Sequence, residues 1–104
     1  MPAFVVLTTA PDLKTATNLA KTLVKKKTAA CVSLREGFTS FFRWKGKIKR
    51  SQETLLLIKT TQKKFPELKN LIIELHPYSV PEILAIPVSR GSAKYLSWIE
   101  ESFR

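Results

Sequence analysis

The stretch that decides the fold is Phe38-Thr39-Ser40-Phe41-Phe42-Arg43-Trp44, which is followed directly by Lys45-Gly46-Lys47. Its aromatic residues are typical of a β-strand, and the Lys-Gly-Lys tripeptide predicts a tight turn. A returning strand is predicted from Ile48 to Thr60, in which Leu55-Leu56-Leu57-Ile58 is apolar on both faces. A strand of that kind lies at the centre of a sheet or at an interface. The middle of the chain is therefore predicted to be a long β-hairpin.

The part of the chain before the hairpin predicts a strand, a helix and the start of the first hairpin strand. Phe4 to Thr8 is a short apolar run of strand formers, and Asp12 is placed to cap the helix that follows it. The first hairpin strand is predicted to begin at Ala30 and to continue to Trp44 across Glu36-Gly37. A glycine inside a strand pattern indicates a bulge, which favours one bent strand. The alternative is a complete break at Glu36-Gly37, which would shorten the hairpin.

The part of the chain after the hairpin predicts a helix, a strand and a last helix. The helix opens near Gln62 and stops at His76, because Pro77 pushes the preceding residue out of the helical region. A strand is predicted from Ile83 to Val88, and Gly91-Ser92 leads into the last helix. The order is β-α-β-β-α-β plus a C-terminal helix. It predicts a single domain over residues 1–104, an α+β, ferredoxin-like sandwich with an extended hairpin.

Composition limits the class of protein. The formal net charge is +10, with 18 Lys and Arg against 8 Asp and Glu, which favours polyanionic partners or a solvated basic surface. No apolar run approaches the roughly 20 residues of a membrane span. The segment from Met1 to Leu7 does not resemble a signal peptide, and the lone Cys31 suits a reducing compartment. The expected location is therefore the cytoplasm.

The length of the hairpin predicts an oligomer. A strand from Ala30 to Trp44 would extend roughly 50 Å at about 3.3 Å per residue. A compact domain of this size spans only roughly 35 Å. The tip would therefore project from the body with Phe41, Phe42 and Trp44, and such aromatic arms usually lie on another subunit.

Several segments together resemble one family. They are Ala29-Ala30-Cys31-Val32, Thr39-Ser40, Trp44-Lys45-Gly46-Lys47-Ile48, Glu74-Leu75-His76-Pro77-Tyr78, Val80-Pro81-Glu82-Ile83 and Tyr95-Leu96-Ser97-Trp98-Ile99. In this order and spacing they resemble the CutA family, from Phe4 to about Glu101. The resemblance implies a ferredoxin-like fold assembled as a tight homotrimer, with an architecture similar to that of the PII signalling proteins. It also implies a link to divalent-cation tolerance and copper binding in bacteria, and to protein anchoring in animals.

Metal binding is one hypothesis for the site, with Cu(II) or another divalent cation as the ion. The resemblance implies copper ligands at three positions, but Thr8 stands where other members have Cys, and Leu75 stands where they have a second His. Only His76 carries over, so a weak site would need Glu82 or a neighbouring subunit to complete it. Cys31 and Met1 are the remaining soft donors of the chain. The alternative is that His76 is a turn histidine hydrogen-bonded to the backbone.

A pocket for a small ligand is a second hypothesis. Lys59, His76, Tyr78 and Glu82, with Trp44 from an adjacent hairpin, are expected to converge at a subunit cleft and to hold a small anion. The alternative is that Trp44 and Tyr78 pack between subunits. A partner protein is a further possibility that the resemblance leaves open.

Enzymatic activity and specific nucleic-acid binding are both disfavoured. One histidine and one cysteine do not make an evident catalytic triad, and the three glycines are scattered, so the chain is expected not to be an enzyme. RNA-recognition domains share the strand order, but the strand that should carry their aromatic motif has none. Loose binding of polyanions stays open because the hairpin tip is basic. Its basic residues are Arg43, Lys45, Lys47, Lys49 and Arg50.

Overall fold

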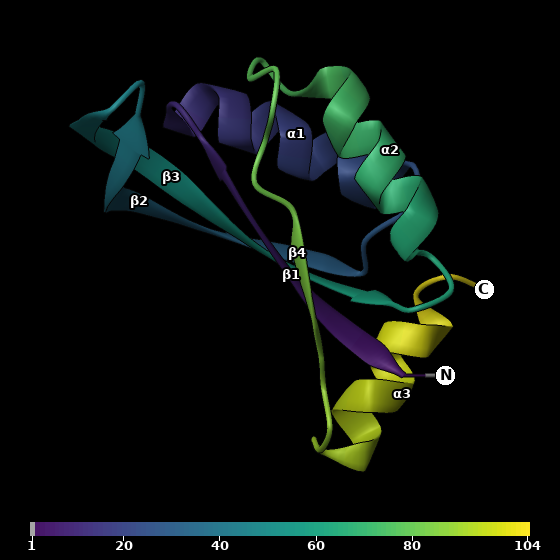
Figure 1. Ribbon diagram of the computed structural model, residues 1–104. Coiled ribbons are helices and arrows are strands. Elements are labelled where there is room, and N and C mark those ends of the chain that lie inside the picture. Colours follow the sequence, from purple (N-terminus) through teal and green to yellow (C-terminus); the bar gives the residue numbers. More distant parts are fainter. Residues whose placement is uncertain (1) are drawn as a thin grey trace.

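The computed structural model describes residues 2–104 as one antiparallel sheet with three helices (Figure 1). Along the chain the elements are β1 (Ala3–Ala10), α1 (Leu13–Lys25), β2 (Cys31–Trp44), β3 (Lys47–Thr61), α2 (Phe65–Leu75), β4 (Leu84–Pro87) and α3 (Ala93–Glu101). The strand order in the sheet is β2-β3-β1-β4, with every pair antiparallel. The predicted α+β class and the predicted order of elements are confirmed. Met1 lies outside the described residues.

The core lies between the sheet and two helices. Alternate residues of β1 and β3 point to one face, where Val6 pairs with Ile58 and Thr8 pairs with Leu56. Helices α1 and α2 cover this face (Figure 1). They contribute the buried side chains Leu19, Leu23, Leu68 and Ile72. The apolar side chains that recur at every second position in the strands therefore pack against those that recur with helical spacing in α1 and α2, and together they form one apolar layer.

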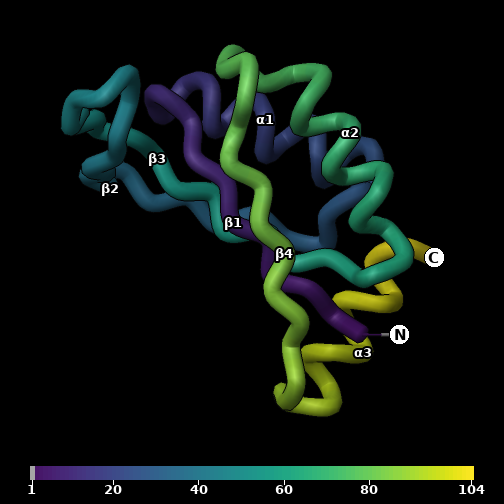
Figure 2. Tube along the Cα trace, viewed as in Figure 1, coloured from purple at the N-terminus to yellow at the C-terminus, as the bar shows by residue number. Residues whose placement is uncertain are grey.

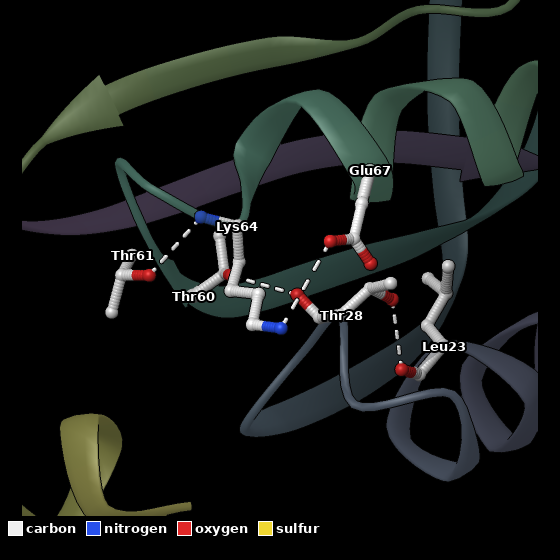
Figure 3. A network of polar contacts seen from close by, with 6 residues as sticks. All are labelled: Leu23, Thr28, Thr60, Thr61, Lys64 and Glu67. Atoms are coloured by element: carbon white, nitrogen blue, oxygen red, sulfur yellow. Dashed lines mark hydrogen bonds and ion pairs between the residues drawn. The ribbon is translucent and has the colours of Figure 1, made fainter. Parts of the chain in front are cut away.

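The end of α1 is tied to β3 by hydroxyl groups (Figure 3). Thr28 donates from Oγ1 to the carbonyl of Leu23 at 2.8 Å, and Thr60 donates from Oγ1 to the carbonyl of Thr28 at 2.7 Å. At the other end of the helix, the Asp12 side chain accepts from the backbone N–H of Thr15 at 2.8 Å, as the sequence predicts for an N-cap. Both ends of α1 are thus fixed by short polar side chains.

The hairpin has the predicted turn and the predicted bulge. Trp44 pairs with Lys47, so Lys45 and Gly46 form a two-residue loop, and both have positive φ angles of 50° and 76°. Positive φ at both positions is the type I′ geometry that matches the twist of the strands. The register shifts between Arg35 and Phe38, at the predicted bulge. The tip projects away from the helices (Figure 2), and the molecule measures 45 Å along its longest axis against 26 and 22 Å across.

Some predicted boundaries were wrong by a few residues. Helix α2 begins at Phe65 rather than near Gln62, because Pro66 favours the first helical turn and the preceding residues form a hydrogen-bonded turn. Strand β4 runs from Leu84 to Pro87 rather than from Ile83 to Val88, since it pairs with only four residues of β1. The end of α2 is as predicted: His76 follows it with φ −76° and ψ 137°, an extended conformation.

The second face of the sheet is apolar and largely uncovered. Its side chains include Val5, Leu7, Leu55 and Leu57, which are half-buried, and Leu84 and Ile86, which are 56% and 48% exposed. Helix α3 lies at one end of the sheet, away from α1 and α2 (Figure 1). Within residues 2–104, no helix has both the length and the apolar character needed to cross a membrane.

Candidate functional site

A carboxylate held by two hydroxyl groups lies where β1, β3 and the segment between α2 and β4 meet. Glu53 of β3 accepts two hydrogen bonds at the same oxygen, Oε2. The Tyr78 hydroxyl donates one at 2.9 Å, and Thr9 of β1 donates the other from Oγ1 at 3.2 Å. The position of Thr9 follows from the β1–β3 register, in which it faces Leu55, two residues along from Glu53. Three distant parts of the chain therefore orient one carboxylate.

His76 fixes the segment that carries Tyr78. The imidazole is buried, and its Nδ1 accepts from the backbone N–H of Tyr78 at 3.0 Å. The proton must therefore be on Nε2, which donates to the carbonyl of Thr9 at 2.6 Å. The His76 and Tyr78 rings also contact each other, with their centroids 4.8 Å apart. His76 is thus hydrogen-bonded through both ring nitrogens, as expected for a turn histidine.

The environment of Tyr78 keeps its hydroxyl protonated. Burial, followed by the hydrogen bond to Glu53 and the negative charge of that residue, raises the pKa of Tyr78 to about 12. Asp12 adds a smaller contribution in the same direction. A phenol with this pKa remains a hydrogen-bond donor throughout the physiological range. The Tyr78–Glu53 contact is therefore a constant feature of the site.

The carboxylate of Glu53 opens onto a groove of about 910 Å³. One side of the groove is the hairpin, which contributes Trp44, Lys49 and Arg50, and the other side contributes Tyr78 and Glu82. The groove combines aromatic surface with side chains of both charges. Its volume lies in the range of roughly 300–1,000 Å³ typical of small-molecule sites.

The structure brings together three of the five predicted pocket residues. Trp44, Tyr78 and Glu82 line the groove, and His76 lies behind Tyr78 without lining it. Lys59 is elsewhere, where it pairs with Val5 and donates from Nζ to Ser33 Oγ at 2.9 Å. Within one chain, Lys59 lies toward the opposite end of β3 from the groove residues Lys49 and Arg50. Lys59 also lies 3.8 Å from Cys31 Sγ.

Sequence reasoning missed Glu53 and Thr9 and assigned Lys49 and Arg50 only to a basic tip. A usable signal was present, because Glu53 is the first acidic residue after the basic run that begins at Arg43. No sequence pattern pointed to Thr9, because its position beside Glu53 depends on the register between β1 and β3.

The residues present do not fit a tight, resident copper site. Both nitrogens of His76 are already hydrogen-bonded, and Glu82 is exposed. Thr8 is fully buried in the core and Leu75 is half exposed. In the part of the chain that the structure describes, no three residues among His, Cys, Asp and Glu cluster as metal ligands would. Met1, a soft donor by sequence, lies outside the described residues.

The predicted interface residues are exposed in the single chain. Phe41 is 68% exposed, Phe42 is 45% exposed and Trp44 is 56% exposed. These features define a class of protein, the ferredoxin-like domains with an extended hairpin. In this chain the hairpin carries exposed aromatic residues, one sheet face is apolar and open, and the groove holds side chains of both charges.

Comparison with known proteins identifies the family. The family model described as "CutA1 divalent ion tolerance protein" matches residues 4–102, and the chain belongs to that family. It is 48% identical over 98 residues to a divalent-cation tolerance protein CutA of Thermus thermophilus, covering 94% of this chain and 95% of the relative. A chloroplastic CutA protein of Arabidopsis thaliana is 39% identical over 104 residues, and the chain spans 57% of that longer protein.

Solved structures agree with this assignment. The Thermus thermophilus protein superimposes with a TM-score of 0.94 at 47% identity, covering 96% of this chain and 97% of that one. CutA1 from Oryza sativa superimposes with a TM-score of 0.97 at 36% identity, covering all 100% of this chain and 95% of that one. The sheet order and the three helices described above are therefore those of the family.

Proposed function

We propose that the chain works as a cytoplasmic homotrimer without enzymatic activity that contributes to tolerance of divalent cations. The observation that most directly supports the proposed trimer is the exposure of Phe41, Phe42 and Trp44 on the hairpin. Burying the part of these side chains that is still exposed would stabilise the assembly by roughly 25 cal/mol per Å² of apolar surface. The names of family relatives, which refer to divalent-cation tolerance, support the functional part.

The open sheet face supports the same assembly. Leu84 and Ile86 lie on the edge strand β4 and point away from the helices, next to the half-buried side chains Leu7 and Val5 of β1. An apolar face bounded by an edge strand and a projecting arm is suited to a closed ring, in which each subunit covers its neighbour. We propose that three copies pair through this face and through the hairpin.

Metal binding in this proposal is weak and exchangeable. His76 and Glu82 are the proposed donors for Cu(II) or another divalent cation. To bind through Nδ1, the imidazole must give up its hydrogen bond from the Tyr78 N–H, and to bind through Nε2 it must lose its proton and the bond to Thr9. Either loss reduces the net affinity.

Native mass spectrometry with Cu(II) tests this proposal. We expect a trimer that carries no copper at one equivalent, gains copper only with excess metal, and loses that gain in a His76→Asn variant. The variant Glu74→Gln, which removes an exposed carboxylate on α2 two residues away, is the control and should bind as wild type does. Stoichiometric copper at one equivalent, or copper uptake unaffected by His76→Asn, would overturn the metal part.

The groove beside Glu53 supports a second candidate function, that of a trimer that binds a small ligand. Lys49 and Arg50 line the groove together with Trp44 and Tyr78, so it can accept an anionic group, as a PII-like signalling trimer would. Isothermal titration with inorganic phosphate is a direct first test. Binding that disappears in an Arg50→Gln variant would support the groove as an anion site, and binding that persists would place the anion elsewhere on the basic surface.

A further inference from the structure

A group of exposed lysines lies at one end of the helical layer, where α1 ends and α2 begins. The chain segments that carry them are held side by side, because the Thr60 hydroxyl donates to the carbonyl of Thr28 at 2.7 Å. Figure 3 shows this junction. The group, called here the lysine cluster, consists of Lys21, Lys25, Lys26, Lys27 and Lys63.

The positive charge of the lysine cluster is not neutralised by the protein. Within residues 2–104 none of its members forms an ion pair, whereas Lys64 beside it lies 4.0 Å from Glu67. Lys21 and Lys25 are one helical turn apart, where like charges repel each other. The dipole of α1 favours Lys25 in its last turn, but the dipole of α2 disfavours Lys63 just before its first turn. Local structure therefore does not account for the concentration of charge.

Lys27 has a backbone conformation that does not favour lysine. Its φ is 57°, in the left-handed region that glycine and asparagine adopt most readily at the end of a helix. The Lys27 N–H donates to the carbonyl of Val24 at 3.0 Å, so the backbone of the turn is hydrogen-bonded. The turn itself gives no reason for a lysine at this position, and it holds the backbone of the cluster in one conformation.

The lysine cluster lies away from the surfaces that the proposed trimer buries. Helices α1 and α2 cover one face of the sheet, and the open apolar face is on the other side (Figure 1). The cluster is next to the base of the hairpin, where β2 begins at Cys31 and β3 ends at Thr61. The hairpin tip, at Lys45 and Gly46, is at the opposite end of both strands. The cluster therefore stays exposed in the single chain and in the trimer proposed above.

The chemistry of the lysine cluster fits a row of phosphate groups. A lysine ammonium is a compact point charge that binds phosphate without the planar geometry of arginine. The segments 21–27 and 62–64 contain no aromatic residue and no arginine, so they offer no ring for base stacking and no fork for reading a base edge. Their exposed large apolar side chain is Val24, which gives little surface for insertion into a membrane. A nucleic-acid duplex, with its bases inside and about one charge per 1.7 Å of helix axis, matches these features.

We propose that the lysine cluster binds the phosphate backbone of a nucleic-acid duplex without reading its sequence. This inference goes beyond the proposed function, since it depends neither on metal ions nor on the groove beside the hairpin. It places polyanion binding on the ends of α1 and α2 rather than on the basic hairpin tip. A trimer would present three such clusters on its outer helical layer.

Fluorescence anisotropy of a labelled DNA duplex, at salt concentrations from about 50 to about 200 mM, tests the inference with two charge-matched double variants. Lys27→Asn/Lys63→Gln removes two members of the cluster, and asparagine suits the backbone conformation at position 27. We expect it to weaken binding at least tenfold and to make the slope of log K against log salt less steep by about 1.8, because each phosphate contact contributes about 0.9. The control Lys14→Gln/Lys94→Gln removes the same charge from exposed positions on α1 and α3 and should change the affinity less than threefold.

The other outcomes count against the lysine cluster or against the duplex. Equal losses in the two double variants would show that the net charge binds DNA and not the cluster. A clear preference between two duplexes of different sequence, or tighter binding of a single strand than of a duplex, would overturn the proposed mode of recognition. Binding to vesicles of phosphatidylcholine and phosphatidylserine without binding to the duplex would assign the cluster to a membrane surface instead. A wild-type trimer that leaves the duplex free at about 50 mM salt would end the proposal and leave the assembly standing.

Discussion

At the scale of single residues, the chain holds one hydroxyl group in an unfavourable place. The Oγ1 of Thr8 is fully buried on the helix-facing side of the sheet and, within residues 2–104, has no hydrogen-bond partner. A buried polar group without a partner costs about 1–3 kcal/mol. Thr60 of β3, on the same face of the sheet, is equally buried, but its hydroxyl donates to the carbonyl of Thr28. The two threonines therefore make a matched pair for experiment.

Replacing Thr8 with Val should raise the free energy of unfolding by about 1 kcal/mol, because the shape is kept and the unpaired hydroxyl is removed. Thr60→Val should lower it by about 1–3 kcal/mol, because the Thr28 carbonyl loses its donor. Urea unfolding at a fixed protein concentration measures both changes. A loss of stability in Thr8→Val would show that its hydroxyl makes a useful contact.

The Tyr78 hydroxyl should lose its proton at a higher pH than an ordinary tyrosine does. Its pKa is raised to about 12, whereas an unfolded tyrosine titrates near 10. The folded pKa lies above the unfolded one, so the stabilisation from this group is fully present below about pH 10 and is lost as the pH rises toward about 12. Absorbance at the phenolate band should show a late phase that disappears in Tyr78→Phe. Phenolate formation that is the same in both proteins would contradict the Tyr78–Glu53 hydrogen bond.

Residues whose roles are local could be predicted from the sequence, and residues whose roles depend on register could not. Asp12 as a helix cap and His76 as the end of a helix follow from their neighbours in the chain. Glu53 and Thr9 meet only because β1 and β3 pair in one particular register, which the sequence pattern does not specify.

At the scale of elements, the hairpin is the segment whose structure the sequence predicted best. The glycine at the bulge and the Lys45-Gly46 turn were both predicted, and Gly37 and Gly46 adopt φ angles of 75° and 76°. The start of α2 and the ends of β4 were predicted less well. Those boundaries depend on how far a strand finds a partner and on which residue begins the first helical turn.

The turn itself can be improved and weakened by single changes. Lys45 has a positive φ of 50°, which lysine adopts at a cost and asparagine adopts more readily. Lys45→Asn creates the Asn-Gly pair favoured in type I′ turns and should stabilise the protein by up to about 1 kcal/mol. Gly46→Ala should destabilise it by about 1 kcal/mol through backbone strain alone, because a Cβ there meets no neighbour. Thermal unfolding at one protein concentration compares the three proteins, and equal midpoints would refute this account of the turn.

At the scale of the whole molecule, the single chain leaves two apolar surfaces exposed. It exposes an aromatic arm and an apolar sheet face, and its groove lies against that arm. The strand pattern predicted the aromatic arm, and the length of the hairpin predicted that this arm lies on another subunit. In the proposed trimer, the +10 charge of each chain opposes association, so the apolar contacts must outweigh the repulsion between like charges.

Trp44→Ala should weaken the assembly without unfolding the subunit, because Trp44 is 56% exposed in the single chain. The matched control is Val24→Ala on α1, where an exposed apolar side chain lies away from the hairpin. We expect at least a tenfold loss in subunit affinity for the first variant and no change for the second. Circular dichroism should show the same secondary structure in both.

The measurement that tests the central claim most directly is sedimentation velocity of the wild-type protein over a wide range of concentrations. The account predicts one species with the mass of three 11.8 kDa chains, with dissociation appearing in Trp44→Ala at concentrations where the wild type stays intact. A wild-type protein that sediments as a monomer throughout would contradict the assembly. It would also leave the exposed aromatic hairpin without an explanation.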